Sequence, residues 1–324
     1  MATINDVAER AGVSVTTVSR VLNNRGYISE KTRKLVYDTM EELNYQPNEI
    51  ARSLLRKQSN LIGLIVPNVA HPFFAELASA IEFYAYEQGC KLLLCNSQLD
   101  PKKEREYIDM MKRHRVDGII MGSHTLEVEE YTQLNSPVVT IDRKIADLPY
   151  VASDNELGGR LAAELLIAKG CKKVAHLCGH LELDLLANLR TTSFEHTMRE
   201  HGVEFMTLQT SMDVFDQHQY ETMISDLLSR HHDIDGIFAT SDIIAAFVIK
   251  WCHKLGRKIP RDIKIIGYDD VNITSWVSPS ITTIKQPITD MGRMAVELVR
   301  KQMDGERIEQ QNKLRVQLVE RETT

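Results

Sequence analysis

The chain has 324 residues and is 43% hydrophobic, which is typical of a soluble protein with two or three domains. No apolar run approaches the ~20 residues of a membrane-spanning helix, and the first residues lack a secretion signal, so we expect a cytoplasmic protein without membrane contacts. The net charge of −6 is unevenly spread: residues 1–57 contain nine Lys and Arg against seven Asp and Glu, and the remaining residues contain 30 against 38. An acidic body repels phosphate, which restricts any contact with nucleic acid to the N-terminal segment.

Residues 3–22 predict two short helices joined by a turn. Thr3 and Asp6 have the spacing of a capping box, Gly12 stands where a left-handed residue ends a helix, and Ser14 can cap the next one. Helical spacing predicts that the first helix buries Ile4, Val7, Ala8 and Ala11. It predicts that the second helix buries Val18, Val21 and Leu22. A third helix, capped by Ser29, is expected to bury Leu35, Val36, Met40 and Leu43.

Two short helices joined by a Gly-containing turn predict a helix-turn-helix. The N-terminal residues of the second helix would enter the DNA major groove, and its outer face carries Val15, Thr16, Ser19 and Arg20. Val15 can touch a thymine methyl group, Thr16 can donate or accept a hydrogen bond, and Arg20 can bind guanine or phosphate. The alternative interpretation is a three-helix core whose polar face contacts only water.

This stretch resembles the headpiece of the LacI/GalR family of bacterial repressors in four segments: residues 4–8, 11–14, 17–23 and 43–48. The resemblance implies a headpiece of residues 1–46 whose further operator contacts are Thr3, Ser14, Thr17, Asn23 and Tyr45, and a contact by Asn48 just beyond it. It also implies a hinge helix of residues 47–58, with Ala51 at the floor of the minor groove and Leu54 as a wedge that kinks the duplex. A flexible linker is the alternative for this segment.

Residues 59–324 alternate between short apolar runs and amphipathic stretches. The predicted strands are Leu61–Val66, Lys91–Cys95, Gly118–Met121, Val138–Ile141, Lys173–Leu177, Gly236–Ala239 and Ile263–Gly267. The predicted helices lie near residues 73–89, 101–115, 156–169, 190–201, 217–231, 242–255 and 289–303. Alternating strands and helices predict an α/β body of two doubly wound lobes with parallel sheets, a first lobe of residues 59–155 and 288–324 and a second lobe of residues 156–287.

In such sheets ligands bind beyond the C-terminal ends of the strands. Polar and aromatic residues gather at those ends, namely Asn68, His71, Phe73, Phe74, Asn96, Ser97, Ser123, Asp142, Arg143, Arg190, Ser241, Asp242, Tyr268, Asp269 and Asp270. Carboxylates and arginines bind hydroxyl groups, and aromatic rings cover the apolar face of a sugar. The sequence therefore favours a sugar site, although each residue taken alone could equally be a loop cap.

The body resembles the periplasmic sugar-binding fold that this family uses as its effector domain. The resemblance implies effector contacts by His71, Phe73, Phe74, Ser123, Asp142, Arg143, Arg190, Ser241, Asp269 and Gln286. Many relatives have Asn at the positions of His71 and Ser241, so the sugar is not specified. The chain is similar to ribose-operon and sucrose-operon repressors of Gram-positive bacteria, which implies a sugar that releases a near-palindromic operator.

Enzyme motifs are not found: there is no Gly-x-Ser-x-Gly, no P-loop, and no Gly-rich fingerprint after the first strand. His231, His232 and Asp233 end a helix and are expected to be a solvated cap. The cysteines are odd in number and form no Cys-x-x-Cys pair, so we expect reduced thiols. We expect no enzyme activity, cofactor or metal, and the alternatives are a sugar-processing enzyme and a regulator that answers to a non-sugar corepressor.

The C-terminal segment predicts the oligomeric state. Leu314, Val316 and Leu318 alternate with polar residues, which is the period of a strand. The segment is expected to close the body fold, with only two residues as a tail, and it has no heptads for a coiled coil. A homodimer joined through the faces of the lobes is therefore predicted.

Overall fold

The computed structural model describes residues 2–46, 58–123, 125, 126, 128–134, 136–179, 181, 185–209 and 217–324. The chain forms two compact units, Met1–Ser59 and Asn60–Thr324. The predicted hinge contacts Asn48, Ala51 and Leu54 lie outside the described residues. Across the described ranges, no helix combines the length and the apolar character that a membrane crossing requires.

The described residues of the first unit form three helices, α1 (Ile4–Arg10), α2 (Val15–Leu22) and α3 (Glu30–Glu42). The capping predictions are confirmed: the Thr3 hydroxyl accepts from the Asp6 N–H and the Asp6 carboxylate accepts from the Thr3 N–H. Ser14 caps α2 by accepting from the Thr17 N–H at 3.1 Å. Gly12 has φ +65°, a conformation that glycine adopts without strain. The helix-turn-helix therefore follows from local capping.

A small apolar core holds these helices together. It contains Val7, Ala8, Ala11, Val18, Val21, Val36 and Met40. The prediction for Leu35 is wrong, because its side chain is 45% exposed. Leu35 lies to one side of the buried stripe of α3, and Thr39 is buried instead, with its hydroxyl donating to the Leu35 carbonyl oxygen at 2.8 Å.

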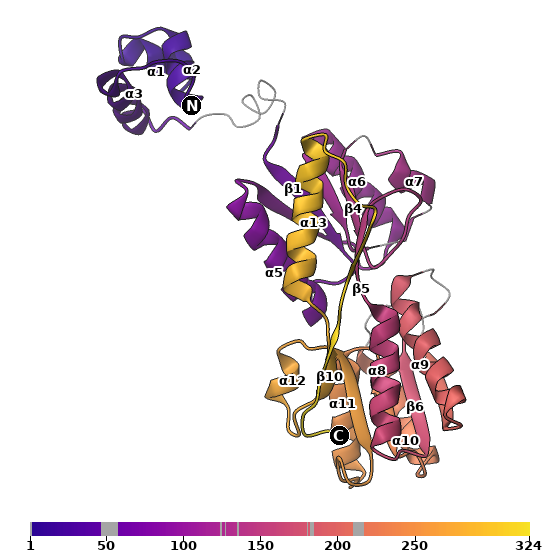
Figure 1. Cartoon of the computed structure of the whole chain (residues 1–324). Helices are drawn as coiled ribbons and strands as arrows, with labels where there is room; N and C mark the ends of the chain where they lie inside the picture. Colours follow the sequence, from indigo (N-terminus) through magenta and orange to yellow (C-terminus); the bar gives the residue numbers. More distant parts are fainter. Residues whose placement is uncertain are drawn as a thin grey trace. The chain divides into compact units, whose positions relative to one another are not determined.

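The second unit contains two six-stranded sheets with matching strand order. The first lobe has the order β11-β5-β4-β3-β1-β2, with the strands β1 (Leu61–Val66), β2 (Lys91–Asn96), β3 (Gly118–Met121), β4 (Val138–Ile141), β5 (Tyr150–Ser153) and β11 (Gln311–Leu314). All its pairings are parallel. Its helices are α5 (Pro72–Glu87), α6 (Pro101–His114), α7 (Val128–Thr132) and α13 (Ile288–Met303). In Figure 1, α13 lies beside α5, with which it packs.

The second lobe has the order β12-β10-β9-β8-β6-β7, parallel except where β12 pairs with β10. Its strands are β6 (Lys173–Cys178), β7 (Glu204–Gln209), β8 (Gly236–Ala239), β9 (Lys264–Asp269), β10 (Thr282–Lys285) and β12 (Gln317–Val319). Its helices are α8 (Asn155–Ala168), the 3-10 turn η1 (Leu186–Asn188), α9 (Leu189–Glu200), α10 (Gln217–Arg230), α11 (Asp242–Lys254) and α12 (Ile273–Trp276). The predicted architecture of two doubly wound lobes is confirmed.

The chain passes between the lobes after β5, after β10 and between β11 and β12 (Figure 1). The C-terminal segment was expected to form one strand of the first lobe, but it forms two strands, one in each sheet. Val316, between them, is buried in the core of the second lobe. Thr323 is also fully buried, so residues 317–324 belong to the second lobe and are not a free tail.

Candidate functional site

The first unit presents part of the predicted DNA-contacting set to solvent. Val15, Thr16 and Arg20 are exposed on α2. Thr3 and Ser14 are exposed as well, but their hydroxyls cap helices. Thr17, Ser19, Asn23 and Tyr45 are half-buried. The outer face of α2 therefore carries one cation, one hydroxyl and one small apolar side chain.

Two pairs among these residues have internal hydrogen bonds. The hydroxyl oxygens of Ser14 and Thr17 are 2.9 Å apart, and the Asn23 amide donates to the Ser19 carbonyl oxygen at 2.9 Å. These bonds hold the two ends of α2. Arg20, in the last turn of the helix, is the side chain of this set with the longest reach and a permanent charge.

Arg190 is the centre of a polar cluster in the second unit. Its Nε donates to Asn155 Oδ1 at 2.5 Å, and its Nη1 donates to the Thr240 carbonyl oxygen at 3.4 Å. The guanidinium lies over the Tyr268 ring, 3.8 Å from the centroid. Its Nη2 is 3.9 Å from Asp142 Oδ2 in the loop after β4. The predicted residues Arg190 and Asp142 are thus brought together from two lobes.

Two adjacent glycines in α8 make this arrangement possible. A Cβ on Gly159 would lie 2.0 Å from the Arg190 carbonyl oxygen, and one on Gly158 would lie 2.4 Å from the Tyr268 hydroxyl oxygen. Asn155, which orients the guanidinium, was not predicted as a site residue, and Tyr268 was predicted only as one of the residues at the strand ends. Their signal in the sequence is the Gly158–Gly159 pair, because glycine is unfavourable inside a helix unless another group approaches closely.

Asp269 is the second carboxylate of the cluster, and it is buried. Its Oδ1 accepts from Gln286 Nε2 at 2.7 Å, and burial raises its pKa to about 7 although the charge of Arg190 opposes this. Burial also raises the pKa of Asp142. Within the described part of the chain, the buried Gln286 Oε1 has no hydrogen-bond partner. The cluster therefore offers ligand acceptors beside one fixed cation.

The aromatic residues lie at the start of α5. Phe73 belongs to the core of the first lobe, and Phe74 packs against that core. The Phe73 and Phe74 rings meet edge to face with centroids 5.1 Å apart, and the His71 ring is 5.9 Å from that of Phe74. Burial and the charge of Arg190 lower the pKa of His71 to about 4, so its ring is neutral at pH 7.

Three predicted ligand residues have structural contacts in this conformation. Ser123 is 1% exposed and donates to the buried carboxylate of Glu104 at 2.6 Å. Ser241 caps α11 by accepting from the Ile244 N–H at 3.3 Å. The guanidinium of Arg143 lies 5.8 Å from the centroid of the Tyr131 ring.

Two family models match this chain. Residues 3–48 match the bacterial regulatory proteins of the lacI family, and residues 163–324 match the periplasmic binding protein-like domain. The ribose operon repressor of Halalkalibacterium halodurans is 41% identical over 326 residues, which span 100% of this chain and 97% of that protein.

Two solved structures similar to this chain are also LacI-type regulators. The lac repressor dimer bound to operator and the anti-inducer ONPF superposes with a TM-score of 0.88 at 27% identity, over 99% of this chain and 98% of that one. A periplasmic binding protein/LacI transcriptional regulator from Alkaliphilus metalliredigens, complexed with D-xylulofuranose, has a TM-score of 0.73 at 35% identity. It covers 82% of this chain and 99% of its own.

Proposed function

Because the chain belongs to the lacI family of bacterial regulatory proteins, we propose that it is the dimeric repressor of a carbohydrate operon, released from its operator by a sugar. The helix-turn-helix binds the operator and the second unit binds the sugar. Because a repressor acts on DNA, its proposed location is the cytoplasm. The relatives are transcriptional repressors, which excludes the enzyme alternative for this family.

The observation that carries the effector site is the cluster of Arg190, Asp142 and Asp269. A buried guanidinium, the buried carboxylate of Asp269 and the half-buried carboxylate of Asp142 can form strong, directional bonds to vicinal hydroxyls. The similar regulator bound to D-xylulofuranose and the ribose operon repressor support a five-carbon sugar. A sucrose-type sugar is the second candidate, because a sucrose operon repressor of Streptococcus mutans is 38% identical over 305 residues.

Release is proposed to follow from differential affinity. A sugar that binds one arrangement of the lobes better than another shifts the population toward it, and the operator-binding arrangement is depleted. On the DNA side the proposed contacts are Val15, Thr16 and Arg20, with Ala51 and Leu54 in the minor groove.

A thermal-shift screen of the full chain against sugars and sugar phosphates tests the proposal, followed by operator release in a gel shift. We expect D-ribose, D-xylulose or sucrose to raise the melting temperature and to release DNA. Stabilisation by purines or amino acids alone would contradict a sugar effector, and turnover of any sugar would contradict a repressor.

Large apolar side chains are exposed on both lobes and suit the interface of the proposed dimer. Phe83 and Tyr86 on α5 are 56% and 58% exposed, and Leu94 on the edge strand β2 is 45% exposed. In the second lobe Trp276 is 77% exposed. Groups of large apolar side chains are seldom exposed to water on a single chain. We therefore assign Phe83, Tyr86, Leu94 and Trp276 to the interface between two copies of the chain.

Sedimentation equilibrium at micromolar concentration is expected to give twice the chain mass of 36.9 kDa. Phe83→Glu should shift the mass toward the monomer, whereas Tyr37→Glu, at an apolar side chain that is 47% exposed in the first unit, should not. A stable tetramer would show that a further interface exists.

The affinity for sugar is expected to rise with pH through about 7. The unliganded carboxyl of Asp269 has its pKa raised to about 7, and a sugar hydroxyl that donates to it favours the ionised form. Below that pH the sugar must displace a proton, so the affinity falls, approaching about tenfold per pH unit. The stability of the free protein depends on pH in the opposite direction. Because the pKa of Asp269 is raised in the fold, its protonated form stabilises the folded state at low pH, and this contribution is lost as the pH rises through about 7.

Calorimetric titration between pH 6 and pH 8 measures this effect. The neutral ring of His71 does not titrate in that window, because its pKa is lowered to about 4. Asp269→Asn is the control and should bind weakly with little dependence on pH. Equal affinity of the unmodified protein at both ends of the range would contradict the role of Asp269.

A further inference from the structure

The loop after β9 connects the effector cluster of Arg190, Asp142 and Asp269 with the C-terminal tail, which is residues 317–324 of the second lobe. Asp269 and Asp270 are consecutive and have φ values of +113° and +61°. L-residues rarely adopt such values, and a strained backbone of this kind persists only where the surrounding structure holds it. Asp269 faces Gln286 and Arg190, whereas Asp270 has different partners. The contacts of Asp270 are therefore candidates for what holds this backbone in place.

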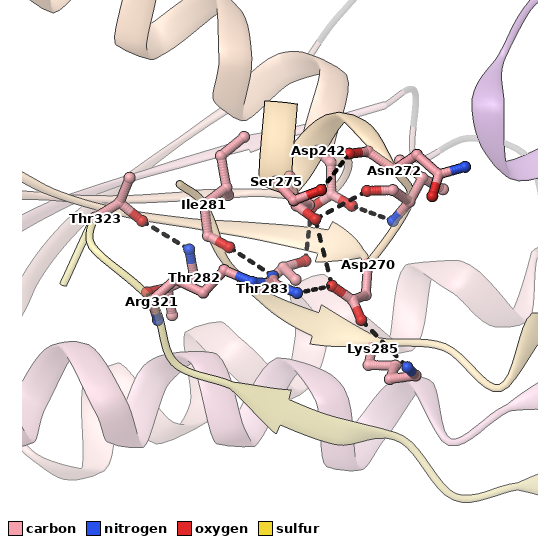
Figure 2. Close-up of polar contacts among 12 residues, drawn as sticks. Asp242, Asp270, Asn272, Ser275, Ile281, Thr282, Thr283, Lys285, Arg321 and Thr323 are labelled. Carbon is pink, nitrogen blue, oxygen red and sulfur yellow. Dashed lines mark hydrogen bonds and ion pairs between the residues drawn. The ribbon is translucent and has the colours of Figure 1, made fainter. Parts of the chain in front are cut away.

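The Asp270 carboxylate is held by two cations (Figure 2). Arg321 Nη2 donates to its Oδ1 at 2.6 Å, and Lys285 Nζ lies 3.4 Å from its Oδ2. The Asp270 side chain is only 8% exposed, whereas Lys285 is 52% exposed. A carboxylate that has lost most of its water depends on its charged partners. Arg321, at 24% exposed and with the shorter contact, is the stronger of the two.

Arg321 is itself fixed by the second lobe. Its Nη1 donates to the Ile281 carbonyl oxygen at 2.9 Å, and its backbone N–H donates to Thr282 Oγ1 at 2.8 Å. The Thr323 hydroxyl accepts from the Thr282 N–H at 2.8 Å and donates to the Ile265 carbonyl oxygen at 2.7 Å. The tail therefore presents the guanidinium from a defined position (Figure 2).

The same loop is held from its other side by Asp242. Its Oδ2 accepts from the Val271 N–H at 3.0 Å, and its Oδ1 accepts from the Thr283 hydroxyl at 2.6 Å. Asp269 is thus followed directly by two anchored residues, Asp270 and Val271. Displacement of either anchor would rotate the peptide that directs the Asp269 carboxylate.

We propose that Arg321 is a positioning residue of the effector site, which acts through Asp270 on the orientation of Asp269. This rests on the proposed role of Asp269 in binding the sugar. Arg321 does not touch the effector. It fixes the strained backbone that presents the carboxylate, so a residue of the tail sets the affinity of a site formed by other elements.

The sugar-binding test uses calorimetry on the full chain with D-ribose, D-xylulose and sucrose as probes. Arg321→Gln is expected to weaken binding by about tenfold, since residues of one polar network are coupled by that order of free energy. Arg321→Lys should recover part of the loss. The matched control is Arg261→Gln, which breaks another ion pair of the second lobe, Arg261 Nε to Asp262 Oδ1 at 2.8 Å, and should bind as the unmodified protein does.

A double-mutant cycle separates positioning from loss of stability. In an Asp269→Asn background, Arg321→Gln should cost little further affinity, whereas a general destabilisation would lower affinity equally in both backgrounds. Full additivity of the two substitutions would overturn the proposal.

Hydrogen exchange provides a readout that needs no effector. The Val271 amide should exchange about tenfold faster in Arg321→Gln than in Arg261→Gln, because its bond to Asp242 requires the loop to stay in place. If no sugar binds the unmodified protein, the proposed effector class fails, and exchange at Val271 still decides the role of Arg321. Unchanged exchange at Val271 would overturn it.

Discussion

Arg190→Ala is expected to give a repressor that binds its operator normally and no longer responds to sugar. The guanidinium contacts Asn155, Thr240, Tyr268 and Asp142, so its loss removes the cation of the cluster and leaves the carboxylates of Asp142 and Asp269 without it. Hydrogen bonds to charged groups contribute about 1.5–3 kcal/mol each, and we expect sugar affinity to fall by about a hundredfold. Calorimetry with the sugar and a gel shift with operator DNA measure the two properties separately.

Arg199→Ala is the matched control for this variant. Arg199 lies on the same helix, α9, but it is 61% exposed and pairs with Glu195 on the surface, so its loss should leave the response unchanged. If Arg190→Ala releases operator at the sugar concentration that the unmodified protein needs, the effector site lies elsewhere in the chain. A circular dichroism melt of both variants confirms that each is folded.

Arg20→Ala is expected to lose specific operator binding while sugar binding stays normal. Arg20 is exposed in the last turn of α2, and a bidentate contact from arginine to guanine contributes about 1–3 kcal/mol of discrimination. Operator affinity should therefore fall by about ten- to a hundredfold, with a smaller loss on unrelated DNA. Gel shifts with both DNAs at fixed salt measure this ratio, since salt alone changes affinity strongly.

Lys34→Ala removes the same charge from an exposed position on α3 and serves as the comparison. It should weaken binding to operator and unrelated DNA alike, because a phosphate contact carries no base information. Operator affinity equal to that of the unmodified protein in Arg20→Ala would refute the assignment of α2 as the recognition helix.

The elements that the sequence predicted well have strong local signals. The three N-terminal helices have hydroxyl caps, and the central strands β1, β3, β4 and β8 are continuous apolar runs buried on both faces. The strands that were missed, β5, β7 and β10, have weaker patterns. β5 mixes Tyr150 and Ser153 with two apolar residues, β7 contains Glu204 and Gln209 at its exposed ends, and β10 is rich in threonine. Their place in the sheet is set by tertiary pairing, which local periodicity does not report.

The site was predicted from strand ends, and this identified the charged residues but not their supports. Asp142 and Asp269 stand at the C-terminal ends of β4 and β9, where ligands of such folds bind, and the structure brings Arg190 of α9 close to both. Asn155 and Tyr268 depend on close approach at two glycines, which requires three-dimensional information. Ser123 was predicted as a ligand contact because its hydroxyl suits a ligand. In the structure this hydroxyl donates to Glu104, a buried acid that the sequence pattern of α6 did not indicate.

The split C-terminal segment has a consequence for how the protein is made. Strands β11 and β12 complete the edges of two different sheets, yet both come after every other strand in chain order. A nascent chain that has produced everything through α13 still has two unfinished lobes. Neither sheet can reach its final edge before residues 311–319 have left the ribosome, so the two edge strands become available together, after every other strand of both lobes.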